Sequence, residues 1–234
     1  MAVILLCLAL SMGGAQDTLR LSPGNHAGPL VVSRPTVILG APGAVLRGDG
    51  HGTVLTILAG PTVVRDLRVE GSGRNPDQYD AGVRIGADSV TLDHVTVRES
   101  LFGVYVERAR DVRLSFVTVV GREQTREGDK GDGISFYDSR SIVADHADVS
   151  GTRDGIYFSY ADSVLISNAH VSHVRFGLHY MFSHENRFEH NVFTDNAAGA
   201  VIMNSRCRSR TTCSPGTREA APTAWSCRPR VTPW

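Results

Sequence analysis

At 234 residues the chain is long enough for one large β domain or two small ones. Its 24 basic and 24 acidic residues balance, so a general affinity for nucleic acid or another polyanion is not expected. No segment after residue 15 approaches the roughly 20 apolar residues that a membrane-spanning helix needs. The protein is therefore not expected to span a membrane.

The N-terminal residues 1–15 resemble a secretory signal peptide. An apolar run ends at Leu10, and the small residues Gly13 and Ala15 occupy the −3 and −1 positions of a plausible cleavage site before Gln16. The segment lacks the basic residues that usually begin such a signal, and a buried first strand is the alternative. We predict that the protein is exported.

Glycines followed by an alternating apolar segment recur at intervals of 21, 30, 22, 22 and 22 residues. These repeat glycines are Gly82, Gly103, Gly133, Gly155, Gly177 and Gly199. The long interval contains residues 121–130, a charged stretch without apolar alternation that we expect to be a loop insertion. About nine residues after each glycine a second apolar segment begins, as at residues 90–97 and 142–149.

Every apolar segment alternates with a period of two and is rich in Val and Ile, which indicates strands rather than helices. A repeat of about 22 residues made only of strands and turns is typical of a parallel β-helix, in which each coil adds one strand to each sheet. Leucine-rich repeats share the period but need a leucine-heavy frame and a helical half. The predicted fold is an all-β solenoid over residues 16–206.

Equivalent positions of successive coils should form columns, because neighbouring strands lie about 4.8 Å apart. Side chains alternate between the two faces of a strand. The positions one and three residues after the glycines are apolar and should face the core. The positions two and four residues after them should face outward, where a solvated surface would favour Thr, Lys, Glu or Asn. They instead include a predicted partner-contact strip formed by Tyr105, Tyr137, Tyr157, His179 and Met181.

Part of this surface could bind a soft metal. His179 and Met181 should project from one face about 7 Å apart, with Met203 one strand beyond Met181 at about 4.8 Å. Imidazole and thioether donors suit Cu(I), so His179, Met181 and Met203 are the candidate ligands for transient copper binding. A methionine beside aromatic residues is more often a hydrophobic contact, and on spacing alone a docking scaffold is favoured.

A carbohydrate-active or carbohydrate-binding β-helix, resembling a polysaccharide lyase or hydrolase, is the third possibility. Such enzymes need paired carboxyl groups at short range. Glu107 is the only acid of the outward columns. Asp132 and Asp154 precede their glycines in adjacent coils and could lie about 5 Å apart, but aspartate before a turn glycine is usually a turn residue. No catalytic residue is assigned, and the protein is not expected to be an enzyme.

The remaining histidines have a structural interpretation. One position of the second segment is occupied in successive coils by His94, Phe116, His146, Asn168 and His190. Ladders of polar side chains at solenoid corners satisfy backbone groups of the turns, and we expect such a ladder here rather than a metal site. His170 and His173 are expected to be ordinary surface residues.

The segments GDGISFYDS (131–139), RDGIYFSYAD (153–162) and especially FGLHYMFSHENRFEHN (176–191) are similar to those of a known family. They resemble the NosD family, periplasmic accessory proteins for maturation of the copper sites of nitrous oxide reductase. The resemblance spans roughly residues 20–206.

This resemblance implies a right-handed parallel β-helix in the periplasm without catalysis of its own. It also implies joint action with the subunits of a membrane ABC-type transporter, receipt of copper from a copper chaperone lipoprotein, and nitrous oxide reductase as acceptor. Sulfur is an alternative cargo to copper. The family motif carries over to His179, Met181 and Met203.

We expect the strand pattern to end at Arg206. Residues 205–234 hold six arginines, a single acid, three of the four cysteines and both tryptophans, and residues 207–234 are predicted to be an irregular basic tail. Arginine makes up 23 of the 24 basic residues, a sign of a GC-rich coding sequence. Out-of-frame translation is therefore the favoured hypothesis, with a genuine disordered tail as the alternative. Either would leave residues 198–205 as an uncapped edge prone to association.

Overall fold

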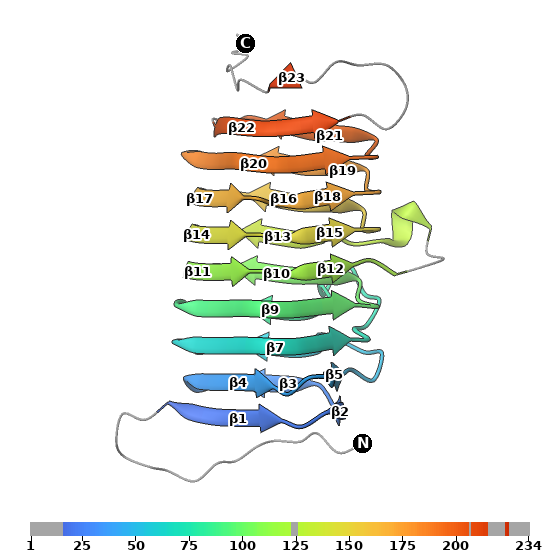
Figure 1. Ribbon diagram of the computed structural model, residues 1–234, viewed down its shortest axis with the longest axis vertical. Coiled ribbons are helices and arrows are strands. Elements are labelled where there is room, and N and C mark those ends of the chain that lie inside the picture. The colour runs from blue at the N-terminus through green and yellow to red at the C-terminus, as the bar shows by residue number, and fades with distance from the viewer. Residues whose placement is uncertain (1–15, 123–125, 206, 215–222, 225–234) are drawn as a thin grey trace.

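The computed structural model describes residues 16–122, 126–205, 207–214 and 223–224. Its strands stack as successive coils along one long axis, from β1 to β22 (Figure 1). All the coils pair in parallel, and from β13 to β21 equivalent residues are 22 apart, so that Ile134 lies opposite Ile156. A parallel β-solenoid of about 22 residues per coil, as predicted, is confirmed.

One face of the solenoid is a sheet of 8 strands in the order β21-β19-β16-β13-β10-β8-β6-β3. Below we name it the site sheet, because it carries the predicted outward columns. Its strands are β3 (Leu30–Val32), β6 (Leu55–Ile57), β8 (Ala81–Ile85), β10 (Phe102–Glu107), β13 (Ile134–Tyr137), β16 (Asp154–Ser159), β19 (Phe176–Met181) and β21 (Ala198–Met203).

The other strands belong to a 15-stranded sheet that bends around the rest of each coil. They are β1 (Asp17–Leu21), β2 (Gly24–Ala27), β4 (Thr36–Gly40), β5 (Ala44–Arg47), β7 (Thr62–Glu70), β9 (Val90–Arg98), β11 (Arg110–Ser115), β12 (Thr118–Val120), β14 (Arg140–Asp145), β15 (Asp148–Ser150), β17 (Asp162–Ser167), β18 (His170–Ser172), β20 (Asn186–Thr194), β22 (Cys207–Ser214) and β23 (Thr223–Ala224). In some coils this part of the chain is one long strand, as in β9 and β20. In others a corner divides it into two shorter strands, as in β11 and β12.

The two apolar columns of the site sheet face the interior, as the alternation predicts. Phe136 pairs with Phe158, which pairs with Tyr180, and all three side chains are fully buried. The Tyr180 hydroxyl accepts a hydrogen bond of 3.0 Å from the Asn186 side chain, so its polar end is satisfied inside the core. Buried apolar area contributes about 25 cal/mol per Å², and this continuous core is the main source of stability.

The predicted corner ladder is present, although its contacts differ from those expected. The five residues of the column all adopt positive φ angles between 51° and 55°. The ring of Phe116 stacks on those of His94 and His146, each at 4.7 Å between centroids. His94 and His146 each bond through Nδ1 to the carboxylate of the preceding aspartate. The imidazole groups of His94 and His146 therefore bond to side chains, whereas bonds to backbone groups of the turns were expected. His170 and His173 are exposed, as predicted.

Buried asparagines satisfy the backbone at other corners. The backbone N–H of Ala169 donates to Asn191 Oδ1 at 2.8 Å, and Asn191 Nδ2 donates to the Ile166 carbonyl at 3.0 Å. Asn186 makes the same pair of bonds with Val164 N and Ala161 O. One side chain thus links two successive coils where the strands are interrupted, a role that the repeat pattern does not predict.

Strand pairing continues beyond Arg206, contrary to the expected boundary. β22 pairs in parallel with β20, with Arg208 opposite Arg187 and Cys213 opposite Phe193. The expectation of an irregular chain from residue 207 was therefore wrong for residues 207–214. Backbone hydrogen bonds define a strand ladder, so pairing persists where apolar alternation is lost. β21 remains the terminal strand of the site sheet.

Of residues 121–130, the described residues 121–122 and 126–130 lie in the connection between β12 and β13 that projects from the column in Figure 1, with a 3₁₀ turn, η1, at Glu127–Asp129. This confirms the predicted loop insertion. Among the described residues, no helix has the length and apolar character needed to cross a membrane. The predicted signal peptide and residues 215–222 and 225–234 of the tail lie outside the described residues.

Replacement of a repeat glycine should destabilise the solenoid strongly. A Cβ atom at Gly155 would overlap the Cγ1 methyl of Val171 and lie 2.7 Å from the carbonyl oxygen of Gly177. Overpacking of this kind typically costs about 1–3 kcal/mol. We expect Gly155→Ala to lower the free energy of unfolding in urea by that amount. Gly86→Ala is the matched control, because the nearest atom to its Cβ would be 3.8 Å away; an equal loss in both variants would contradict this account.

Candidate functional site

The outward columns of the site sheet lie where the sequence predicts. Tyr157 pairs with His179, and Met181 pairs with Met203 on the next strand. Because these positions alternate with the buried columns, their side chains leave the sheet on its outer face. The three candidate copper ligands therefore come from two adjacent strands, β19 and β21.

The exposure of the predicted contact strip is uneven. Tyr137 is 42% exposed, but Tyr105 is only 5% exposed. The ring of Tyr79, from the loop before β8, stacks on Tyr105 at 4.8 Å between centroids. The expectation that Tyr105 offers a free contact surface was therefore wrong. Burial raises the pKa of the Tyr105 hydroxyl far above its usual range, and nearby Tyr79 adds to the effect.

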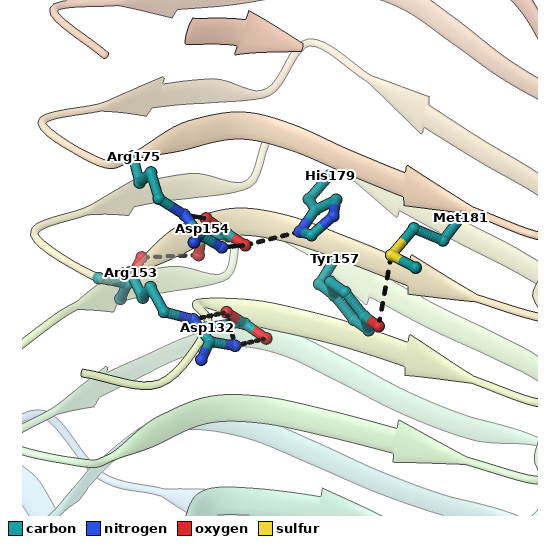
Figure 2. A network of polar contacts seen from close by, with 8 residues as sticks. Asp132, Arg153, Asp154, Tyr157, Arg175, His179 and Met181 are labelled. Carbon is teal, nitrogen blue, oxygen red and sulfur yellow. Dashed lines mark hydrogen bonds and ion pairs between the residues drawn. The ribbon is translucent and has the colours of Figure 1, made fainter. Parts of the chain in front are cut away.

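His179 is held by a buried carboxylate. Its Nδ1 atom lies 2.8 Å from Oδ2 of Asp154, whose side chain is fully buried. Figure 2 shows this bond, which joins β19 to the preceding strand β16. Because a carboxylate accepts, Nδ1 is the protonated nitrogen of the neutral ring, and Nε2 carries the lone pair. No described residue forms a hydrogen bond with Nε2.

Aromatic rings hold the imidazole from two sides. Tyr157 and Phe176 approach it edge to face, with centroids 5.1 Å and 5.4 Å from that of His179. The Arg175 guanidinium lies over the Phe176 ring at 4.4 Å. The side chain of His179 is only 15% exposed. These contacts fix the ring in one orientation before any ligand binds.

Two arginine–aspartate pairs lie to one side of His179 (Figure 2). Arg175 donates two hydrogen bonds to Asp154, at 2.8 Å and 2.7 Å. Arg153 makes the same bidentate contact with Asp132 one coil earlier, at 3.1 Å and 3.2 Å. Bidentate guanidinium–carboxylate pairs are strong and geometrically specific. The pairs therefore lock the beginnings of successive strands of the site sheet.

The two aspartates differ in their acidity. Burial raises the pKa of Asp132 to about 6, with a further contribution from the Asp154 carboxylate and against the lowering influence of Arg153. Burial also acts to raise the pKa of Asp154, but hydrogen bonds from His179 and Arg175 outweigh it and hold that pKa below its usual value. Asp154 is therefore the ionised partner of His179.

Both methionines lie on one side of the imidazole, two positions further along the strands. The Tyr157 hydroxyl lies 3.9 Å from the sulfur of Met181, a contact drawn in Figure 2. Met203 is 44% exposed on the terminal strand of the site sheet. Among the described residues, no group of three or more His, Cys, Asp or Glu side chains could hold a metal ion. The donors available here are one imidazole and two thioethers, a combination that favours soft Cu(I) over hard cations.

Residues 117–212 match a family model described as "Periplasmic copper-binding protein (NosD)". The matched segment contains the whole arrangement of His179, Asp154 and Met181. A protein of Pseudomonas aeruginosa named "Probable ABC transporter binding protein NosD" is 30% identical over 135 residues. A protein of the same name from Stutzerimonas stutzeri is 30% identical over 120 residues. The part of the chain that carries the candidate site is thus similar to NosD proteins.

The match to these NosD relatives is partial. The aligned residues cover 57% and 50% of this chain, but only 32% and 28% of the two relatives. The chain therefore spans about a third of the length of the curated NosD proteins that it matches. The family description places NosD proteins in the periplasm and associates them with copper.

Two solved structures share the fold of this chain. PfbA, a surface adhesin of Streptococcus pneumoniae, superposes with a TM-score of 0.55 at 8% identity, over 86% of this chain and 72% of that chain. A pectin methylesterase variant in complex with a hexasaccharide superposes with a TM-score of 0.52 at 10% identity, over 90% and 84%. Identities this low establish the β-helix fold and nothing further.

The sequence pattern indicates His179 and Met181 but not what positions them. Asp154 was interpreted as a turn residue, whereas it opens strand β16 and is fully buried. The signal that could have found it is a recurrence at 22 residues, which separates Asp132 from Asp154 and, one position earlier in the coil, Arg153 from Arg175. Offset by one coil, each arginine meets the aspartate of the coil before it.

The raised pKa of Asp132 has a testable consequence for stability. The folded protein retains this proton between about pH 4 and 6, where the unfolded chain has released it. The group's contribution to the free energy of unfolding is therefore full below about pH 4 and is lost as the pH rises through about 6. Since one pKa unit corresponds to about 1.4 kcal/mol, the loss is at most about 3 kcal/mol.

We expect the free energy of unfolding of the wild type, measured relative to Asp132→Asn, to decline between about pH 4 and 7. Urea denaturation at several pH values measures this difference. Asp145→Asn is a control, because the pKa of that partly exposed carboxyl is lowered and its contribution changes in the opposite direction. A difference independent of pH would show that Asp132 is ionised throughout.

Proposed function

We propose that this protein is an exported, non-catalytic NosD-type maturation factor that helps to deliver copper to nitrous oxide reductase. In this proposal residues 1–15 direct the chain to the periplasm. A copper chaperone lipoprotein supplies copper, and the subunits of an ABC-type transporter in the membrane work with the protein. The description of the family and the names of the relatives support a copper-associated periplasmic role.

The observation that carries the proposal is the fixed imidazole of His179 beside two thioethers. The bond to Asp154 puts the proton on Nδ1 and leaves Nε2 as the donor atom. Met181 is two residues further along β19, and Met203 pairs with it on β21. Imidazole and thioether ligands can bind Cu(I) without a carboxylate or thiolate ligand. A site with so few ligands suits transient binding of a copper ion that must be transferred to another protein.

Asp154 acts in this proposal as the group that orients the ligand. Metal-binding histidines commonly donate their second N–H to a carboxylate, which fixes the tautomer and raises the basicity of the ligating nitrogen. The bidentate contact with Arg175 in turn keeps Asp154 ionised and in place. Copper is the cargo in this proposal, and sulfur is the alternative.

The outer face would also contact the partner proteins. Tyr137 and Met203 are 42% and 44% exposed, and Tyr157, His179 and Met181 lie between them in partly buried positions. Exposed tyrosine and methionine side chains on a rigid sheet are typical of binding surfaces. A partner that covers this strip would reach bound copper directly.

A carbohydrate-active role has less support from the contacts. Asp132 and Asp154 are 3% and 0% exposed and each is paired with an arginine. Glu107 forms ion pairs with Arg84 and Arg108. General acid–base catalysis on a glycosidic bond needs carboxyl groups that reach the substrate, and these side chains are engaged within the protein.

The proposal is tested by titration with Cu(I) under reducing conditions in competition with a chromophoric chelator. We expect the wild type to bind Cu(I), and His179→Ala and Met181→Ala each to weaken binding by about tenfold or more. Asp154→Asn should weaken it by about 10- to 100-fold, the usual effect of removing an outer-shell partner. Met203→Ala tests the third ligand in the same way.

His184→Ala is the matched control, because His184 is exposed in the turn that follows β19 and lies off the outward columns. It should bind copper as the wild type does. If the wild type and all the ligand variants bind Cu(I) with equal stoichiometry and affinity, copper does not bind at this site. The strip would then be a protein-contact surface.

A further inference from the structure

An open cleft of about 500 Å³ lies beside the Arg153–Asp132 pair, outside the candidate copper site. The loop before β8 forms one wall with Arg74 and Pro76, and the insertion between β12 and β13 forms the other with residues 128–131. The cleft is of the size that usually holds a ligand.

The described lining of the cleft is strongly basic. Its cationic side chains are Arg74, Arg122, Arg126, Lys130 and Arg153. Asp129 is the only acid among the described lining residues. The whole chain has no net charge, so this excess is local. Arg74, Arg126 and Lys130 form no ion pair with any described residue.

Two of the cations are held in fixed positions. Arg122 donates to the backbone carbonyls of Ser72, of Gly73 at 3.1 Å and of Glu99 at 3.1 Å. Arg153 is held by its bidentate contact with Asp132. Ordering these long side chains in advance removes an entropy cost that ligand binding would otherwise carry. The cleft is therefore preorganised for an anion.

The cations also repel one another. Burial lowers the pKa of the Arg122 guanidinium, and the charge of Arg74 lowers it further, against the raising influence of Glu99 and Asp80. Like charges gathered in a partly desolvated cleft raise the free energy of the empty protein. A bound anion would relieve this repulsion while gaining hydrogen bonds from guanidinium groups.

The arrangement of the coils gives the cleft its length. Gly131 N–H donates to the Leu101 carbonyl at 3.2 Å, and Arg153 N–H donates to the Gly131 carbonyl at 2.9 Å. These three lining residues thus belong to successive coils and span about 10 Å at the usual strand spacing. Arg74 comes from the coil before them, which places cations along the full length of the cleft.

We propose that this cleft binds an extended acidic peptide segment of another protein. Side chains on one edge of an extended peptide recur about every 6.6–6.8 Å, from a rise of about 3.3 Å per residue. Carboxylates spaced in this way can contact cations from several coils at once, which a single small oxyanion cannot. The apolar side chains of Pro76, Leu101 and Phe102 in the lining can contact the aliphatic parts of the peptide.

A charged oligosaccharide fits the lining less well. Sugar rings bind through the flat face of an exposed aromatic side chain as well as through their charges. Phe102, the aromatic residue of the described lining, is only 5% exposed and packs against Tyr79 at 5.6 Å. The lining therefore offers charge and small apolar contacts but no exposed ring face.

The test is fluorescence anisotropy of a labelled hexaglutamate peptide on the full chain. We expect saturable binding that weakens steeply between about 50 and 300 mM salt, values on the order of those that screen surface charge. Hexaglutamine should not bind. Arg74→Gln combined with Arg126→Gln should weaken binding by about tenfold or more, since both arginines are exposed and contribute charge rather than structure.

Arg20→Gln combined with Arg113→Gln is the matched control, because it removes the same charge from exposed positions on the 15-stranded sheet. Binding unchanged from the wild type in this control supports the cleft. Three outcomes would each overturn the proposal. The first is equal weakening of binding in both double variants, and the second is binding of hexaglutamine as tight as that of hexaglutamate. The third is displacement of the labelled peptide by trigalacturonate at a lower concentration than by unlabelled hexaglutamate. Melting curves of the variants exclude loss of folding as the cause, and the comparison of the two peptides on the wild type tests the proposal without any variant.

Discussion

The constant register between successive coils is the constraint on which the rest of this structure depends. Ile134 lies opposite Ile156, which lies opposite Leu178, and the same offset aligns every other position of these coils. Backbone hydrogen bonds between parallel strands impose this alignment, and the buried columns favour it, because a slip of one residue would turn the apolar side chains outward. A column of equivalent residues is therefore the natural unit of the molecule.

The candidate copper site depends on this alignment and on the arginine–aspartate pairs beside it. The columns bring Tyr157, His179 and the methionines to neighbouring strands, but a column alone leaves side chains free to rotate. The Arg–Asp pairs give the site its rigidity, since Asp154 is shared between Arg175 of the next coil and the imidazole of His179. Burial of these charges is tolerable because each carboxylate has a bidentate partner; removal of either member would leave an uncompensated charge in the interior.

The loop before β8 and the insertion after β12 add a basic cleft next to the site sheet. Tyr79, from the loop before β8, covers Tyr105, and described residues of the insertion after β12 line the cleft beside that loop. Between the two loops lies the basic cleft. The outer surface thus carries an apolar, thioether-containing strip on the strands of the site sheet and a cationic groove between two loops, and the Asp132–Arg153 pair lies beside both.

The sequence by itself determined the fold, the 22-residue period, the core columns and the outward placement of His179, Met181 and Met203. These are consequences of local alternation and repeat spacing, which each segment displays without reference to its neighbours. Only the tertiary structure decided that Tyr105 is covered, that Asp154 holds His179, and that pairing continues through Cys207–Ser214. The cover of Tyr105 and the pairing of Cys207–Ser214 depend on where loops of irregular sequence fold and on backbone pairing, which leave no periodic trace in the sequence. The contact of Asp154 with His179 joins residues 25 apart, and the 22-residue recurrence of Arg153 and Arg175 indicates only the arginine partner of Asp154.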